Sequence, residues 1–226
     1  MDCAALAQFL AELEHNNNKT WFEANRSRYD ALRADFTDLV EEVIFGVAAF
    51  DPRAQGLTPK DCIYRIYRDV RFSKDKTPYK TTFSAAIPRN MIGAGYYFQL
   101  AHDGKLMTAG GYYMPDNDAL ARIRTFIAQR PGQLQAVLDE PGFRAQFGTL
   151  DGPRLTRLPR GFDEDTPLPD MVKLKSFTVA KEYPVRDLDG DALAPLVVAD
   201  FRAMRPLVAW LREALGYMGA SVNRPA

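Results

Sequence analysis

The segment TTFSAAIPRNMIGAGYYFQLAHDGKLMTAGGYYM, residues 81–114, decides the fold class. It contains three short runs of β-forming side chains, at residues 81–88, 96–101 and 106–114, which glycine-bearing turns separate. The Asp103-Gly104 pair between the last two runs is typical of a hairpin turn, because both residues tolerate a positive φ angle. Strands joined by such short turns predict an antiparallel β-meander.

Helical patterns precede this meander. Apolar residues recur at helical spacing within residues 1–15 and again from Thr20 to Asp51, where the following proline ends the pattern. Thr20 and Glu23 match a capping box at the start of the second helix. We expect the two helices to form an antiparallel hairpin.

More helices and one more strand are predicted after the meander. Helices are expected to start at Pro115-Asp116 and at Pro131, and short helical turns are expected over PGFRAQFG, residues 141–148. A proline-rich loop, the strand KSFTVAKEY (175–183) and a closing helix (191–215) follow. Since no repeat or linker is evident, the sequence predicts a single α+β domain over residues 1–226. Its antiparallel β-meander packs against the N-terminal helical hairpin and the C-terminal helices.

Composition excludes several classes of protein. Lys plus Arg (29) balance Asp plus Glu (29), so no global field attracts the chain to nucleic acid or membrane. The longest apolar run, Val43–Phe50, is too short to span a bilayer, and the N-terminus lacks the pattern of a signal peptide. Cys3 and Cys62 are too few and too scattered for a disulfide framework, and free thiols suit a reducing cytoplasm. We therefore expect a cytoplasmic protein without a cofactor or a membrane partner.

A second segment, RIYRDVRFSKDKTPYK at residues 65–80, concentrates positive charge. It holds six cations and two aspartates, a net charge of +4 in a chain whose formal net charge is zero. Residues 62–72 alternate β-formers with charged residues, which predicts an extended strand. The turn after it would place Lys74 and Lys76 over that strand.

This segment suggests a binding site for an anion. Arg68 lies on the apolar face of the predicted strand, where a guanidinium requires carboxylates, carbonyls or a bound anion. Forked guanidinium donors and ammonium groups suit phosphate and carboxylate. Our leading hypothesis is a small anionic, phosphate-bearing ligand, with Asp69 orienting the arginines or acting as a base. The ligand would be held by Arg65, Arg68, Asp69, Arg71, Lys76 and Tyr79.

Two other functions remain open from the residues alone. Arg68 and Asp69 could form a structural latch, meaning an internal ion pair that only ties strands together, in a protein-interaction module without a ligand. Nucleic-acid binding is a third hypothesis, because tyrosines among arginines and lysines can stack on bases. The zero net charge and a pI near 6.7 argue against it. No residue pattern decides whether the protein is an enzyme.

Other motifs carry little chemistry. The chain has no P-loop and no Gly-x-Ser-x-Gly elbow, and His15 and His102 are too far apart in sequence to predict a zinc site or a triad. No metal site is predicted, although the carboxylates at residues 163–165 could bind magnesium if other ligands converged on them. Near the start of the second helix, further contributors to an anion pocket are Asn17, Lys19 and Arg26.

Four blocks of the chain resemble one bacterial and fungal family, which is catalogued as domain of unknown function 2461. Three of them lie at residues 16–29, 109–115 and 158–177. The fourth resembles the family signature, Arg65-x-x-Arg68-Asp69-x-Arg71-Phe72-x-x-Asp75-Lys76-x-x-Tyr79. The resemblance implies an α+β fold and marks these residues as central, but implies no activity. The chain departs from it at Thr166, where many members carry histidine, so no general base is assigned there.

Overall fold

The computed structural model of the chain describes residues 1–89, 93–150, 152–188 and 190–216. The contacts within it group into two compact units, each described by itself below. Unit 1 consists of Met1–Asn90, Tyr97–Thr108 and Glu182–Asp200, and unit 2 of Met91–Tyr96, Ala109–Lys181 and Phe201–Ala226. The single domain over residues 1–226 stays a prediction.

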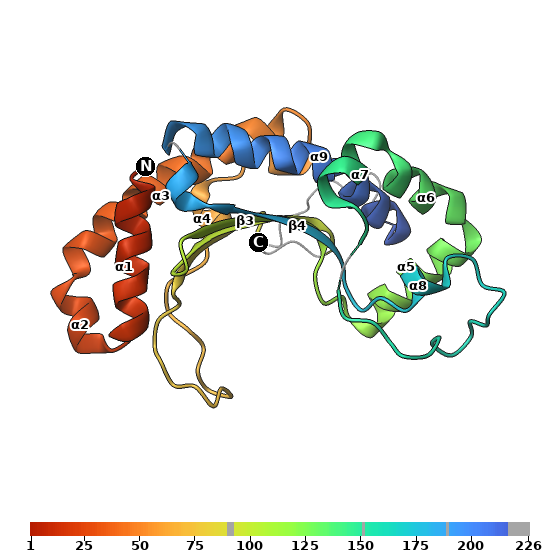
Figure 1. Cartoon of the computed structure of the whole chain (residues 1–226), viewed down its shortest axis with the longest axis horizontal. Coiled ribbons are helices and arrows are strands. Elements are labelled where there is room, and N and C mark those ends of the chain that lie inside the picture. The colour runs from red at the N-terminus through yellow and green to blue at the C-terminus, as the bar shows by residue number, and fades with distance from the viewer. Residues whose placement is uncertain (90–92, 151, 189, 217–226) are drawn as a thin grey trace. The chain divides into compact units, whose positions relative to one another are not determined.

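The predicted α+β class and the antiparallel meander are confirmed (Figure 1). The described residues form a four-stranded antiparallel sheet in the order β1-β2-β3-β4. Gly104 has a φ of 73° in the hairpin turn between the second and third strands, and its N–H donates to the carbonyl of Ala101 at 3.0 Å. Part of the glycine-bearing turn predicted before the second strand falls on residues 90–92, outside the described residues. The strands are β1 (Thr82–Ile87), β2 (Gly95–Ala101), β3 (Lys105–Tyr112) and β4 (Phe177–Pro184).

The N-terminal helices differ from the prediction in one respect. The first helix is confirmed, but the second, predicted from Thr20 to Asp51, is two helices that meet at Asn25. Asn25 leaves helical geometry with a ψ of 15°, while its side-chain amide donates to the carbonyl of Trp21 at 3.0 Å. The predicted Thr20 cap is wrong, because Asn18 accepts from the Trp21 N–H at 3.0 Å. The helices are α1 (Cys3–His15), α2 (Lys19–Ala24) and α3 (Arg26–Ala48).

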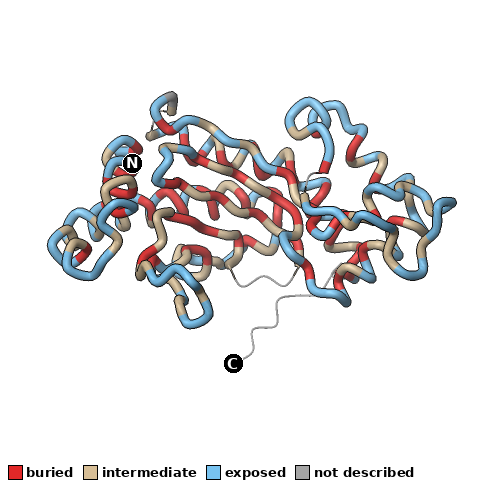
Figure 2. Tube along the Cα trace, turned by 60° about the horizontal axis from the view of Figure 1, so that its bottom comes forward, coloured by how far each residue is buried: buried red, intermediate tan, exposed pale blue. Residues whose placement is uncertain are grey.

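The core of unit 1 lies between α3 and the sheet. Phe36 of α3 is buried, and its ring lies 5.5 Å from that of Phe83 on β1 and 5.6 Å from that of Phe98 on β2. Helix α1 packs on α3, where Arg28 donates to Glu12 at 2.7 Å. Figure 2 shows that buried positions follow the strands and the inner faces of the long helices.

Short helices make up much of unit 2. The predicted start at Asp116 is confirmed, because its carboxylate accepts from the Ala119 N–H at 2.8 Å. Arg124 donates to the carbonyls of Val172 and Leu174 at 2.8 and 3.0 Å, which ties α5 to α8 and the residues after it. The helices after the meander are α5 (Asn117–Gln129), α6 (Pro131–Asp139), α7 (Pro141–Phe147), α8 (Pro169–Val172) and α9 (Leu193–Ala214). Short 3₁₀ turns lie at Pro52–Ala54, Val185–Asp187 and Gly190–Ala192.

The long helix α9 belongs partly to each unit. In unit 1 its Asp200 is only 2% exposed and accepts hydrogen bonds from the hydroxyls of Thr108 at 2.7 Å and Tyr183 at 2.9 Å. In unit 2 its Phe201 stacks on Tyr96, with ring centroids 5.1 Å apart. Within the described residues, no helix combines the length and the apolar character that crossing a bilayer requires.

The strand predicted over residues 62–72 does not form as one element, and only its first half pairs with another part of the chain. Cys62 ends the short helix α4 (Pro59–Cys62), and two isolated antiparallel bridges follow. Ile63 bridges to Ala85, and Tyr67 bridges to Tyr79. The Arg68 N–H still donates to the Pro78 carbonyl at 2.9 Å. Beyond it the chain continues as a loop whose side chains bind the loop's own backbone, an alternative to strand pairing that short polar residues favour.

Candidate functional site

The segment at residues 68–77, named here the basic loop, is braced by its own side chains. Arg71 and Asp69 form a forked pair, with Nε to Oδ1 at 2.9 Å and Nη2 to Oδ2 at 2.6 Å. These hydrogen bonds lower the pKa of the Asp69 carboxyl. The Lys76 ammonium donates to the Val70 carbonyl at 2.8 Å. Arg71 and Lys76 thus hold the loop in shape while their charges stay at the surface.

Arg68 has a carboxylate partner within the same loop. Its guanidinium, on a side chain that is 27% exposed, donates to the Asp75 carboxylate and to the Thr77 hydroxyl. Asp75 also accepts from the Thr77 backbone N–H at 2.9 Å. The hydrogen bond from that N–H, followed by the one from Arg68, lowers the pKa of Asp75 to about 2. Asp75 therefore supplies part of the negative charge that the Arg68 guanidinium requires.

This pairing predicts an acid transition of the loop. Because the pKa of Asp75 is lowered to about 2, its stabilising contacts are complete above the unfolded value of about 3.9. They are lost as the pH falls through about 2. An NMR titration of the Asp75 carboxyl carbon and the Thr77 amide should give that midpoint, and Arg68→Ala should move it upward. A wild-type midpoint near 4 would contradict the pairing.

Tyr79 is fixed by contacts from the N-terminal helices. Its ring stacks on Phe22 of α2 with centroids 4.0 Å apart. The Asn17 side chain donates to the Tyr79 carbonyl at 2.9 Å and accepts from its N–H at 3.0 Å. Arg26, another of the three expected contributors, lies 5.3 Å above the Phe22 ring and 3.8 Å from Glu23. The start of the second helical region therefore positions Tyr79.

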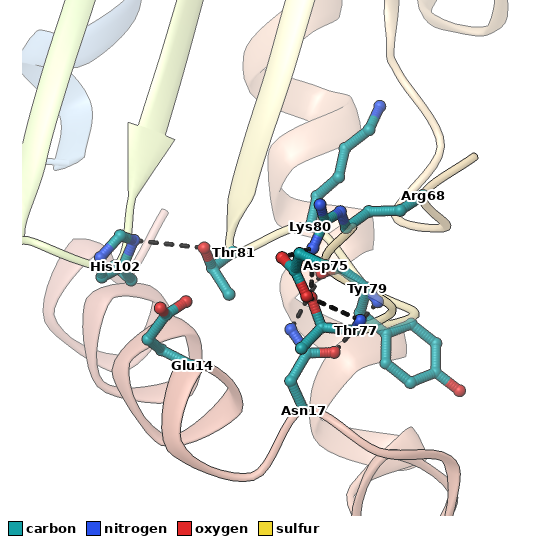
Figure 3. A pocket seen from close by; sticks show the side chains of 9 residues that line it. All are labelled: Glu14, Asn17, Arg68, Asp75, Thr77, Tyr79, Lys80, Thr81 and His102. Carbon is teal, nitrogen blue, oxygen red and sulfur yellow. Dashed lines mark hydrogen bonds and ion pairs between the residues drawn. The ribbon is translucent and has the colours of Figure 1, made fainter. Parts of the chain in front are cut away.

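A cavity of about 350 Å³ opens in unit 1 beside these contacts (Figure 3). Its walls come from the end of α1, the turn after it, the basic loop, the residues that lead into β1, and the turn after β2. Figure 3 shows the Arg68 guanidinium beside Asp75, the Lys80 side chain extending away from them, and the Tyr79 ring pointing away from His102. The lining residues are Glu14, Asn17, Arg68, Asp75, Thr77, Tyr79, Lys80, Thr81 and His102.

The expected ligand residues divide into two groups. Arg68 and Tyr79 line the cavity. The other four residues do not line it. Arg65 is exposed, and the basic loop contains the remaining three, Asp69, Arg71 and Lys76.

Lys80 is a cavity residue that the sequence reasoning did not select. Its ammonium lies 5.1 Å from the centre of the Tyr64 ring, and no carboxylate of the described residues lies within 4.0 Å of it. Burial lowers the pKa of Lys80, and the nearby charges of Arg65 and Arg89 lower it further. The signal was present in the sequence, because Lys80 is the last cation of the basic segment.

His102 was also missed, since it lies in the hairpin turn after β2. Its backbone N–H donates to the Thr81 carbonyl at 3.0 Å, and its ring Nδ1 lies 3.2 Å from the Thr81 hydroxyl. Both contacts join residues 21 positions apart in sequence, so no local motif could have paired them. Together they bring an imidazole and a hydroxyl to the cavity.

The carboxylates at residues 163–165 lie in unit 2. The Thr166 hydroxyl donates to the Asp163 carboxylate at 3.2 Å and accepts from the Asp163 backbone N–H at 3.0 Å. Thr166, which stands where the family pattern often has histidine, thus closes a local turn. Among the described residues, no group of three His, Cys, Asp or Glu side chains is arranged to hold a metal ion.

Comparison with known proteins places this architecture in a family. A family model described as conserved hypothetical protein (DUF2461) matches residues 5–210, a span that includes the basic loop and every residue that lines the cavity. No curated protein and no solved structure matches the chain. The match extends over most of the 226 residues and confirms the resemblance noted in the sequence. The chain therefore belongs to the family of conserved hypothetical proteins DUF2461.

Proposed function

We propose that the protein binds a small anionic ligand, such as a phosphate-bearing metabolite, in the cavity that Arg68 and Lys80 line. The observation that carries this proposal is the environment of Lys80. Lys80 is a half-buried residue that lines the cavity, and no carboxylate of the described residues lies within 4.0 Å of its ammonium. An anion that enters the cavity would stabilise a cation in such a place, because it supplies the missing counter-ion.

The charges around Lys80 support the same proposal. Burial lowers the pKa of Lys80 most, and the charges of Arg65 and Arg89 lower it further, so like charges lie near its ammonium. Arg89 donates to the Ile63 carbonyl at 2.5 Å. Within the part of the chain that the structure describes, no carboxylate lies within 4.0 Å of its guanidinium. An anion bound near Lys80 would relieve this repulsion, and a guanidinium beside an ammonium suits the paired oxygens of phosphate.

The size and the remaining groups of the cavity limit the ligand. A volume of about 350 Å³ falls at the lower end of the range of roughly 300–1,000 Å³ for small-molecule sites. The hydroxyl of Thr81 and the ring of His102 offer hydrogen bonds, and Glu14 offers an acceptor. A compact molecule that carries both an anionic group and a hydroxyl or ammonium group fits this set.

Thermal denaturation with inorganic phosphate, pyrophosphate and sugar phosphates tests the proposal. At about 100 times its Kd, a bound ligand should add about 2.7 kcal/mol and raise the Tm by roughly 5 to 10 °C. Lys80→Met keeps the apolar stem, removes the charge and should abolish the shift. Lys74→Met is the matched control, because Lys74 is exposed outside the cavity lining. A panel that leaves the wild-type Tm unchanged would count against the site.

A protein-interaction module with structural arginines is the second candidate. It draws on the pairs Arg68–Asp75 and Arg71–Asp69, which brace the basic loop without any ligand. For such a module, Arg68→Ala should lower the Tm and no ligand should raise it. No reaction is proposed, since an anion site of this kind serves a binding protein as well as an enzyme.

The cytoplasm is the compartment that we propose. Cys3 and Cys62 are both buried free thiols, as a reducing environment allows. Neither nucleic acid nor a membrane is proposed as a partner, because the formal net charge is zero.

A further inference from the structure

The tip of the basic loop holds an aromatic ring in solvent. Phe72 is 97% exposed, an unusual position for a large apolar side chain. The loop that carries it is braced by the Arg71–Asp69 pair, and the Arg71 guanidinium lies 5.9 Å from the Phe72 ring. A ring that a braced loop presents in this way is suited to enter a pocket on another molecule.

Unit 1 also has an apolar groove, of a kind that could accept an aromatic ring such as that of Phe72. It has a volume of about 500 Å³ and lies between α3 and the first residues of α9. Phe45, which is 83% exposed, forms one of its walls. The helices touch at its floor, where a Cβ on Gly46 would lie 2.6 Å from Val198. The groove is lined by Glu41, Glu42, Phe45, Gly46, Ala194, Pro195 and Val198.

The charges of the two surfaces are complementary. The exposed carboxylates of Glu41 and Glu42 border the groove, while Arg71 and Lys74 flank Phe72 on the loop. We propose that the groove is occupied by Phe72 of a second copy of this chain, with the loop's cations facing the two glutamates. One contact of this kind would bury both exposed phenyl rings and pair the surrounding charges.

The loop of a copy does not fill that copy's own groove. Within unit 1, Figure 1 shows the loop extending from the sheet in the direction away from α3 and α9. Contact between copies therefore runs from loop to groove. It gives either a two-fold pair, in which each loop enters the other copy's groove, or a heterologous chain of copies. Because a single loop tip buries less than the roughly 1,200 Å² of a standard interface, the association should be weak and sensitive to salt.

Sedimentation velocity of the full chain, from about 1 µM to about 1 mM at low salt, tests the proposal. The wild type should self-associate, and Phe72→Ala should raise the Kd on the order of 30-fold. The double variant Glu41→Lys/Glu42→Lys should weaken it similarly. Tyr113→Ala removes another ring, 72% exposed and outside both surfaces, and should leave the Kd unchanged. All three variants change exposed side chains, so each should keep the wild-type circular dichroism.

Mixing the two defective proteins provides a sharper test. Phe72→Ala keeps an intact groove, and Glu41→Lys/Glu42→Lys keeps an intact loop tip. The mixture should therefore form heterodimers with a lower Kd than the homodimers of either variant alone. Three outcomes would overturn the proposal. They are a wild type that stays monomeric throughout, self-association that survives Phe72→Ala, and a mixture that does not associate.

Discussion

Gly111→Ala is expected to lower the free energy of unfolding by about 4 kcal/mol or more, an exceptional effect for one methyl group. Gly111 has a φ of 126°, in the region that side chains rarely adopt. An added Cβ would lie 2.0 Å from the Phe177 carbonyl oxygen and 2.9 Å from the Thr178 Cα. Both are backbone atoms, so β3 and β4 would have to separate to admit the methyl group.

Urea denaturation of Gly111→Ala and Gly104→Ala separates steric overlap from backbone strain. Gly104 also has a positive φ, 73°, but a Cβ there would meet nothing within 4 Å. Gly104→Ala should therefore cost only the left-handed backbone penalty, about 1 kcal/mol. If the two variants lost equal free energies of unfolding, the close approach of the strands at Gly111 would contribute nothing to the cost of Gly111→Ala.

Phe22→Ala is expected to cost about 3–5 kcal/mol, the usual range for removing a fully buried ring. Phe22 is 0% exposed, and its ring centroid lies 4.0 Å from that of Tyr79 and 5.0 Å from that of Tyr29. The cavity left behind would remove the support of Tyr79. Ligand affinity should fall together with stability, although Phe22 does not line the cavity.

Phe22→Leu is the control, because it keeps most of the volume and removes the aromatic stack. It should cost about 1–2 kcal/mol, as moderate core substitutions do. Chemical denaturation gives the stability of both variants, and calorimetry with the ligand found by thermal shift gives the affinity. A loss under about 1 kcal/mol for Phe22→Ala would contradict the anchoring role.

Much of the fold could be predicted because burial imposes its period on the sequence. Along β2, Tyr96, Phe98 and Leu100 are buried while Tyr97 and Gln99 are partly exposed, which is the alternation expected of a strand with one covered face. Helix α3 likewise buries one face. Because these apolar positions are the ones that contact the core, their spacing distinguishes a strand from a helix.

The same alternation was misleading at residues 62–72. Burial alternates from Tyr64 to Arg71 as it would in a strand. Beyond Arg68, however, the backbone bonds locally, because Asp69 accepts from the Arg71 backbone N–H at 3.3 Å within the loop. A pattern of residue types does not show whether a backbone N–H bonds to a neighbouring strand or to a side chain two positions away.

The candidate site could be predicted only where it is local in sequence. The run of cations identified Arg68 and also contains Lys80, but Glu14 and His102 come from separate elements. They meet because β1 pairs with β2 and α1 ends nearby, and residue spacing contains no information on such meetings.

The hydrogen bonds between Asn17 and Tyr79 have a consequence for solubility. An unpaired strand edge is a template for intermolecular pairing and for amyloid growth. The amide of Asn17 occupies both main-chain groups of Tyr79, as a neighbouring strand would. The Asn17 side chain is therefore expected to protect the chain from aggregation at this position. A variant without it would leave the N–H and the carbonyl of Tyr79 open to pairing with another molecule.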